Sequence, residues 1–480
     1  MSIFKFLKKM KSKLQCKRLM KRKRFTEAVV CAISANEKIK LYYHLGLYQS
    51  VLSMLHKNKA ENFLAEIIAL SAIGAYSDIL PRLNMYKKTV EYLKNRTILI
   101  QALAPYNSEL AFSLFCEKET SVLKLAFCSH LNKSFDIKTI QYEKFSNQPD
   151  TILLFSNLKR QTTQERLNSF NQYLSYFNLS KVGLRKDANT FNVMNLTAVT
   201  QQEVYGPLVT VLMTSHNSSE YVFLALDSLL KQTYKNIEII VVDDNSDDDS
   251  VDIIMSIARK DNRVKVISLS CNVGTYVAKT IGFKYALGEF VTCQDSDDWA
   301  HPKKIELQVV PLLNNKNLSY TTSQWVRLQS NGVFYARAVF PLTRFNPASV
   351  LFRKSIIEDK VGLWDLVKTG ADSEFNARLK LVLSEKSHHY VKKPLTVASH
   401  RQGSLMTDAV TGYDKFGKNL SRLEYWESWN HWHIAELQHG KLPYMDWDSS
   451  MKRKFTAPDA ITISPFLIKE GMNSAKVLTK

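Results

Sequence analysis

Several features that would assign a chain to a specialised class are missing here. The six cysteines include no C-x-x-C pair, so neither a disulfide framework nor a structural zinc site is expected, which fits a reducing compartment. No apolar run reaches the roughly 18 residues needed to cross a bilayer, and the N-terminus lacks the apolar segment of a secretory signal. The 480 residues therefore predict a cytoplasmic, globular protein of two or three domains.

Acidic residues are missing from one end of the chain. Residues 1–24 contain eleven Lys and Arg and no Asp or Glu, against a formal net charge of +20 for the whole chain. Apolar residues recur at helical spacing between 3 and 14, which predicts a basic amphipathic tail at an anionic inner-membrane surface. A solvated tail remains an alternative. No motif beyond the charge supports a nucleic-acid partner, so none is expected.

Glycine and proline are scarce between residues 25 and 135, which predicts an α-helical domain. A weak repeat relates residues 44–52 to residues 72–80, with Gly46 and Gly74 in equivalent places. Each glycine is expected in the turn between two helices, as in tetratricopeptide-like arrays with a shorter repeat. Such arrays bind protein partners or self-associate, and a plain helical domain is an equal alternative.

Residues 136–205 combine short apolar segments with polar connections. Residues 151–155 are expected to form a short buried strand, and residues 164–177 an amphipathic helix. The stretch before Gly206 and Pro207 is polar and weakly patterned. A small α/β segment and linker are therefore expected here, followed by the main domain boundary.

Apolar strands alternate with helices after this boundary. The alternation predicts right-handed βαβ units on a parallel sheet, and therefore an α/β domain. Ligands of such sheets bind at the carboxyl ends of the strands, where polar residues follow three of the segments. The expected strands span residues 208–213, 237–242, 263–269 and 289–294, and the expected helices 219–231, 248–260 and 275–287.

Two carboxylates, Asp295 and Asp297, follow the last of these strands. Alternate residues leaving a strand point the same way, so both side chains can converge on one point. Neighbouring carboxylates are costly without a cation, and Mg²⁺ or Mn²⁺ held by carboxylates and substrate phosphates is the usual arrangement. The alternative is a solvated acidic turn in which Asp298 caps the next helix.

Five segments in a fixed order resemble the bacterial family 2 glycosyltransferases of capsule and lipopolysaccharide-type polysaccharide biosynthesis. The resemblance covers residues 206–405. It implies a GT-A fold, which is a Rossmann-like nucleotide-sugar-binding domain, and a UDP-sugar-dependent hexosyltransferase with Mn²⁺ or Mg²⁺. The segments are residues 209–217, 227–234, 241–246, 272–290 and 295–302.

The resemblance also implies which residues bind the nucleotide. Thr214 and His216 would contact the base, from a turn that includes Asn217. Asp244, which follows Asp243, would take the uracil or the ribose.

The diphosphate and the metal would be bound by residues further along the chain. Lys279 and Arg401 would contact the diphosphate. Asp297 would be the main metal ligand, and Asp295 would reach the sugar, the ribose or the metal. His400 would complete the metal shell; a structural or solvated histidine is the alternative.

An acidic motif at residues 369–375 would form the acceptor side. An inverting transfer needs a base that takes the proton of the acceptor hydroxyl. Asp372 is the expected base and Glu374 the alternate. The alternative is that Asp372 only caps the helix that follows.

Residues 406–480 are expected to form a helical, aromatic-rich extension whose rings pack on the α/β domain; stacking of the rings on sugar faces is the alternative. The resulting hypothesis is a metal-dependent inverting glycosyltransferase, peripheral at the inner face of the plasma membrane. It would move a sugar from a UDP-sugar to a hydroxyl of a glycan or lipid-linked glycan acceptor on the bacterial surface. The rival is a non-catalytic helical-repeat protein that binds partners and carries a degenerate GT-A domain.

Overall fold

The computed structural model divides the chain into two compact units, each built from separate stretches of sequence. The first contains Met1–Glu117, Leu405–Tyr444 and Lys452–Ile461, and the second contains Lys118–Ser404, Met445–Met451 and Thr462–Lys480. The structure describes residues 3–134, 148–158, 161–199, 202–414, 417–446 and 453–479. Within these ranges no helix is both long and apolar enough to cross a membrane.

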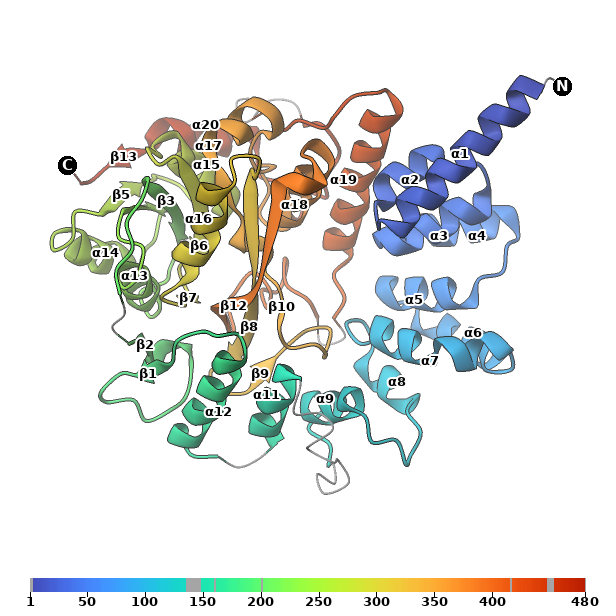
Figure 1. The fold of residues 1–480 in the computed structure, drawn as a ribbon, viewed down its shortest axis with the longest axis horizontal. Coiled ribbons are helices and arrows are strands. Elements are labelled where there is room, and N and C mark those ends of the chain that lie inside the picture. Colours follow the sequence, from blue (N-terminus) through green and yellow to red (C-terminus); the bar gives the residue numbers. More distant parts are fainter. Residues whose placement is uncertain are drawn as a thin grey trace. The chain divides into compact units, whose positions relative to one another are not determined.

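Unit 1 is helical, and its helices follow one another in short hairpins (Figure 1). Gly46 ends α3 with a φ of 71° and Gly74 ends α5 with a φ of 79°, a left-handed conformation that favours glycine. The predicted turn glycines are therefore confirmed, whereas binding of a partner by the array stays a prediction. The helices are α1 (Ile3–Lys21), α2 (Phe25–Cys31), α3 (Ala35–Leu45), α4 (Tyr48–Asn58), α5 (Phe63–Ile73), α6 (Tyr76–Lys87), α7 (Val90–Leu103) and α8 (Ser108–Ser113).

The aromatic helix α19 (Leu420–Gln438) packs into this unit, among the N-terminal helices and not on the α/β domain that precedes it in the sequence. Glu427 caps the start of α4, because its carboxylate accepts hydrogen bonds from the backbone N–H groups of Gln49 and Ser50 at 2.6 and 3.1 Å. The Trp426 indole N–H donates to the Leu45 carbonyl at 2.7 Å. The two contacts satisfy backbone groups on both sides of the Gly46 turn.

Unit 2 begins with helices, and here one prediction is wrong. Residues 151–155 lie in the helix α11 (Pro149–Leu158) and do not form a strand. The helix is buried on all sides, and a short apolar run does not distinguish a buried helix from a buried strand. The predicted amphipathic helix is present as α12 (Thr163–Tyr176). The remaining elements here are α9 (Val122–His130), β1 (Val182–Leu184) and β2 (Leu196–Ala198); expectations for residues 135–147 lie outside the described residues.

The centre of unit 2 is a mixed sheet whose first half was predicted strand by strand. Four parallel strands lie in the order β5-β4-β3-β6, and helices cover them (Figure 1). Their apolar side chains form one core with those of α13 and α14. The strands are β3 (Val209–Ser215), β4 (Ile237–Asp243), β5 (Val264–Ser268) and β6 (Phe290–Asp295), and the helices are α13 (Val222–Leu230), α14 (Ser250–Ala258) and α15 (Thr275–Lys284).

The second half of the sheet continues from β6 through β11, β8, β12 and β7. The strand β11 is antiparallel to both β6 and β8, whereas β12 is parallel to β8. The elements are β7 (Trp299–Ala300), α16 (Lys304–Asn314), β8 (Tyr320–Gln329), β9 (Phe334–Tyr335), β10 (Arg344–Phe345), β11 (Leu351–Arg353), α17 (Lys354–Ile356), α18 (Ala371–Val382) and β12 (His388–His400).

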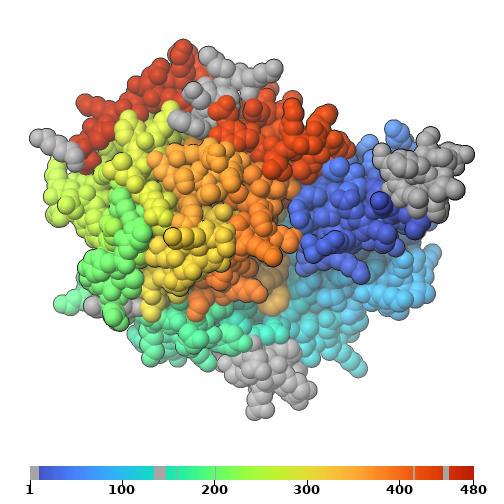
Figure 2. Space-filling model, turned by 45° about the horizontal axis from the view of Figure 1, so that its top comes forward, coloured from blue at the N-terminus to red at the C-terminus, as the bar shows by residue number. Residues whose placement is uncertain are grey.

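The last segment of the chain returns to the edge of this sheet. The helix α20 (Pro465–Ser474) packs on α15, and β13 (Lys476–Val477) pairs antiparallel with β5. Figure 2 shows this red segment beside the green-to-yellow residues at the surface. The end of the chain therefore supports the helix that carries Lys279.

Candidate functional site

The sheet brings the predicted polar segments together at the carboxyl ends of its parallel strands. Thr214 of β3 is level with Asp295 of β6, and Ser215 is level with Asp243 of β4. The chain order of the strands reverses between β3 and β6, and open α/β sheets bind their ligands at such a reversal.

Two neighbouring acids organise the loops at this edge. The buried Asp244 carboxylate accepts hydrogen bonds from the backbone N–H groups of Val273 and Gly274, both at 2.7 Å. Burial raises the pKa of Asp244, and these two bonds act in the opposite direction because they stabilise the charged form. Asp243 accepts from the Ser246 backbone N–H at 3.0 Å and from its hydroxyl at 2.6 Å. Both carboxylates therefore hold backbone in place.

The turn after β3 is fastened to the same loop. A His216 ring nitrogen, Nδ1, lies 3.0 Å from the Asp244 carbonyl oxygen. Asn217 adopts a left-handed φ of 46°, and its side-chain oxygen accepts from the Asp247 N–H at 3.0 Å. The Thr214 hydroxyl lies 2.8 Å from that of Thr275, at the start of α15. The turn and the loop thus form one fixed wall of the site.

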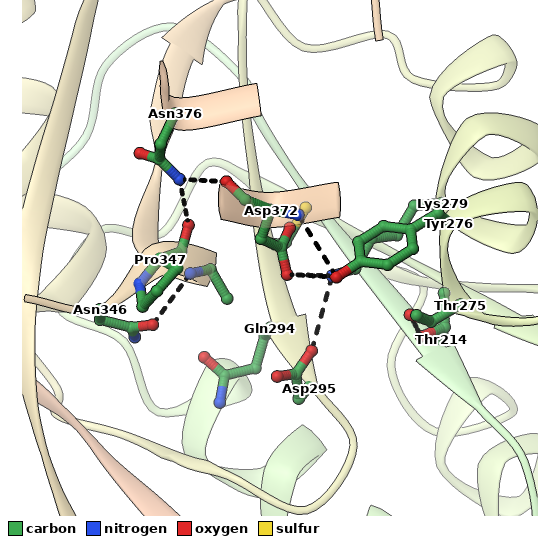
Figure 3. Close-up of polar contacts among 12 residues, drawn as sticks. Thr214, Thr275, Tyr276, Lys279, Gln294, Asp295, Asn346, Pro347, Asp372 and Asn376 are labelled. Carbon is green, nitrogen blue, oxygen red and sulfur yellow. Dashed lines mark hydrogen bonds and ion pairs between the residues drawn. The ribbon is translucent and has the colours of Figure 1, made fainter. Parts of the chain in front are cut away.

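Lys279 stands between two acids that are far apart in the sequence (Figure 3). Its side chain is 1% exposed, and its ammonium lies 3.7 Å from a carboxylate oxygen of Asp295 and 3.7 Å from one of Asp372. The Tyr276 hydroxyl donates to Asp372 at 3.1 Å. An acid of β6 and an acid of α18 therefore meet at one buried cation.

Asp372 has the electrostatic setting of a carboxylate with an elevated proton affinity. It lies in the first turn of α18, two residues after the N-cap residue Gly370. Burial and the Asp295 charge raise the pKa of Asp372, while Lys279 and the Tyr276 hydroxyl act in the opposite direction. The Asp372 backbone carbonyl accepts from the Asn376 side chain at 2.7 Å. The carboxylate is thus held in place with one side on Lys279.

Asp297 and Asp298 differ in their partners. The guanidinium of Arg401, the residue after β12, donates to Asp297 at 2.9 Å and stacks over Tyr221. Asp298 is buried and accepts from the Ser399 N–H at 3.0 Å. It does not cap the next helix, which starts at Lys304, so the alternative of a solvated acidic turn does not hold for this residue.

The carboxylates suit a divalent cation, with one predicted ligand set apart. Burial and repulsion from Asp295 raise the pKa of Asp297. Burial and repulsion from Asp297 and Asp295 raise the pKa of Asp298, so the motif carries excess negative potential. Asp295, with a side chain 41% exposed, is open to a substrate or ion. The His400 ring stacks on Tyr335 with centroids 4.0 Å apart. Across the described ranges no group of three or more His, Cys, Asp or Glu side chains is arranged to hold a metal ion, so Asp295 and Asp297 would need substrate phosphates to complete the coordination.

Glu374, expected as the alternate base, has a structural environment instead. Its side chain is 0% exposed and forms two 2.8 Å bonds to the equally buried Arg378. The same guanidinium donates to the carbonyls of Val361 and Leu363. Glu374 thus neutralises an arginine that anchors the loop before α18, and we correct its expected role accordingly.

Two contributors to the site were not identified from the sequence. Tyr276 lies one helical turn before Lys279, and this i, i+3 spacing on α15 was the available signal. Gln294 accepts from the buried Lys304 ammonium at 2.6 Å and donates to the Asp298 carbonyl at 2.9 Å. Both residues position the acids that the sequence did identify.

Residues 210–362 match the family model described as glycosyl transferase family 2. An uncharacterised glycosyltransferase of Haemophilus influenzae is 39% identical over 109 residues, which are 23% of this chain and 44% of the relative. Glycosyltransferase GlyG of Streptococcus pneumoniae is 40% identical over 99 residues, 21% of this chain and 33% of the relative. WfgD of Escherichia coli is a UDP-Glc:alpha-D-GlcNAc-diphosphoundecaprenol beta-1,3-glucosyltransferase. It is 32% identical over 126 residues, which are 26% of this chain and 49% of the relative.

The chain covers less than half the length of each of these three relatives. Among solved structures, S. aureus TarS (residues 1–349) in complex with UDP-GlcNAc is 22% identical and covers 41% of this chain and 59% of that one, with a TM-score of 0.35.

Proposed function

We propose, from the match of residues 210–362 to the glycosyl transferase family 2 model, that the protein is a metal-dependent, inverting glycosyltransferase. The donor in this proposal is a UDP-sugar, and the acceptor is a hydroxyl of a bacterial surface glycan or of its lipid-linked precursor. The similarity to WfgD, which uses UDP-Glc and a diphosphoundecaprenol-linked sugar, supports this choice of donor and acceptor.

The carboxyl edge of β3, β4 and β6 binds the donor in this proposal. Thr214, His216 and Asn217 form the turn that receives the base, and Asp243 and Asp244 keep the facing loop in register. Lys279 and Arg401 supply positive charge for the diphosphate. Asp295 and Asp297 would hold Mn²⁺ or Mg²⁺, which neutralises charge on the leaving diphosphate when bound.

Asp372 acts on the acceptor. Its carboxylate takes the proton of the acceptor hydroxyl while that oxygen forms a bond to the anomeric carbon and the bond from this carbon to the UDP oxygen breaks. The position of Lys279 between Asp295 and Asp372 carries the proposal, because it joins a donor-side acid to an acceptor-side acid through one buried ammonium. A raised pKa suits Asp372 as a base near neutral pH.

The basic helix α1 would keep the enzyme at an anionic inner-membrane surface. Met10 and Leu14 are 47% and 64% exposed, amid exposed Lys11, Lys13 and Lys17. Apolar side chains beside exposed lysines are typical of a helix lying in the headgroup layer. The hairpins of unit 1 would provide a surface for a protein partner or for self-association.

The decisive experiment measures UDP release from a panel of UDP-sugars with Mn²⁺, before and after EDTA. Asp297→Ala should lower the rate about 10³-fold because it removes the main metal ligand. This corresponds to a rise of about 4 kcal/mol in the activation barrier. The matched control is Asp252→Ala, an exposed acid on α14, which should leave the rate unchanged. UDP release that neither EDTA nor Asp297→Ala alters would refute the metal-dependent enzyme, and no release with any donor would favour the partner-binding alternative.

A further inference from the structure

One face of the second half of the sheet carries an unusual set of side chains. Exposure alternates along β8: Val326 and Leu328 are buried, whereas Trp325, Arg327 and Gln329 are partly exposed. Residues 325, 327 and 329 therefore share the accessible face of this strand.

Cross-strand pairing extends this face to the neighbouring strands. Arg344 of β10 is paired with Trp325, and Tyr335 of β9 is paired with Arg327. His400, at the end of β12, is level with Gln329. Paired residues lie on the same side of a sheet, so these side chains form one surface, here called the arginine face: Trp325, Arg327, Tyr335, Arg344 and His400.

Rings hold the arginine face rigid. The Arg327 guanidinium lies 4.3 Å from the centre of the Trp325 ring. The Tyr335 ring stacks with that of His400, with centroids 4.0 Å apart, and with that of His130, with centroids 5.7 Å apart. A stacked guanidinium keeps its edge N–H groups free for a planar or tetrahedral anion, which is the usual geometry of bidentate recognition.

The two arginines of this face have no direct ion pair among the described residues. Neither Arg327 nor Arg344 has a salt bridge to a carboxylate or a hydrogen bond to a protein group within the part of the chain that the structure describes. Burial, followed by repulsion from Arg337 and Arg327, lowers the pKa of Arg344, and burial lowers that of Arg327. Asp150 offsets part of this effect for Arg344, and the acids near β6 do so for Arg327. A guanidinium that forms no direct bond to a carboxylate keeps its N–H groups for an anionic ligand.

The arginine face adjoins the metal motif. Arg327 is level with Ala398 of β12, and the next residue, Ser399, donates its N–H to Asp298 at 3.0 Å. The charges of Asp298, Asp297 and Asp295 act on the Arg327 guanidinium. A molecule bound here would therefore extend from the reacting centre along β8, away from the β3–β4 turn that receives the base.

We propose that the arginine face is an acceptor subsite for a negatively charged glycan, in which Arg327 and Arg344 bind a carboxylate or phosphate group of the acceptor. Stacking on Trp325 keeps the Arg327 guanidinium in place, and pairing of β10 with β8 places Arg344 beside that ring. This inference rests on the proposed function for its acceptor role, whereas anion binding by this face can be measured without any transfer.

The test is a calorimetric titration of the full chain with paired saccharides. Oligogalacturonate is compared with its neutral methyl ester, and N-acetylglucosamine 6-phosphate with N-acetylglucosamine, which separates carboxylate from phosphate recognition. Titrations are repeated with saturating UDP, so that the anions cannot occupy the diphosphate site. At least one anionic probe should bind about 10- to 100-fold more tightly than its neutral partner, and added salt should weaken it.

Arg327→Gln and Arg344→Gln should each weaken binding of that probe by about 10-fold or more, while Arg259→Gln, an exposed arginine after α14, should not. The inference is overturned if charged and neutral probes bind alike, if Arg259→Gln weakens binding equally, or if UDP displaces the probe. Failure of the proposed function is a different result, namely no UDP release from any donor; a protein that releases UDP but shows no anion preference refutes only this inference.

Discussion

In the proposed mechanism, Asp372 is the residue on which the acceptor chemistry depends. Asp372→Asn keeps the side chain's shape and its place beside Tyr276 but removes the group that accepts a proton. Transfer should fall by about 10²–10⁴-fold, the range for loss of a general base, while the Kd for UDP stays near its wild-type value. Steady-state transfer assays and UDP titration measure the two. If the Asp372→Asn enzyme had wild-type turnover, Asp372 would not be the base, and its role would be limited to the first turn of α18.

Lys279 tunes the same acid. Its ammonium lowers the pKa of Asp372 against the raising effects of burial and Asp295. In Lys279→Gln the pKa of Asp372 should rise further, so a higher pH is needed to keep the carboxylate ionised. The acidic limb of the kcat/KM profile should therefore move to higher pH, by about 1–3 units. Lys284→Gln, on the exposed end of α15, is the control. If the acidic limb of the kcat/KM profile did not move, Lys279 would not control the pKa of the base.

The sequence identified chemically distinctive residues better than it identified their partners. The order of the acids placed Asp295 and Asp372 in one site, and the structure gives them a common neighbour in Lys279. Glu374 was misassigned because the sequence does not reveal burial, although its i, i+4 spacing to Arg378 pointed to a helical ion pair. The bonds from Asp244 to Val273 and Gly274 depend on how two distant loops meet, which no local pattern encodes.

At the scale of elements, periodicity predicted the parallel strands and their helices because each is long and bounded by polar turns. The predicted GT-A class is confirmed by the family match and by the helix-covered parallel sheet. The antiparallel return through β11 and the parallel pairing of β12 with β8 were not predicted, since they join segments distant in sequence. The strand predicted for residues 151–155 was wrong because the segment is short. A run of five residues fits both a buried strand and a buried helix.

The helix α15 lies close to the sheet because Gly282 has no side chain. A Cβ at this position would lie 3.0 Å from a methyl of Val242 and 3.3 Å from one of Leu212. Gly282→Leu should therefore push α15 away from β3 and β4 and lower the free energy of unfolding by about 1–3 kcal/mol. Denaturant unfolding measures this, with Tyr285→Leu, a partly exposed site after the same helix, as control. Equal effects of both changes would contradict close packing at Gly282.

At the scale of the molecule, the N-terminal helix α1 supplies both exposed positive charge and side chains of the hydrophobic core. The exposed lysines of α1 contribute to the net charge of +20, yet Cys16 of that helix is buried against Ala28, Val29 and Leu41. Deleting residues 1–24 would therefore remove core as well as charge. Substitution of the exposed side chains separates the two effects.

Replacement of Lys11, Lys13 and Lys17 by Gln should abolish most binding of the full chain to anionic phospholipid vesicles without unfolding unit 1. Each lysine contributes about 1 kcal/mol at such a surface, so the triple variant should bind roughly 100-fold more weakly, and added salt should weaken the wild type in the same way. Vesicle co-sedimentation measures the binding, and thermal unfolding checks the fold.

The control replaces Lys57, Lys87 and Lys88, in or beside α4 and α6, by Gln; it lowers the net charge equally but leaves α1 intact. If both variants bind alike, membrane affinity comes from the overall charge. If the wild type does not bind vesicles, α1 is a solvated basic helix, because Met10 and Leu14 then gain nothing by leaving water.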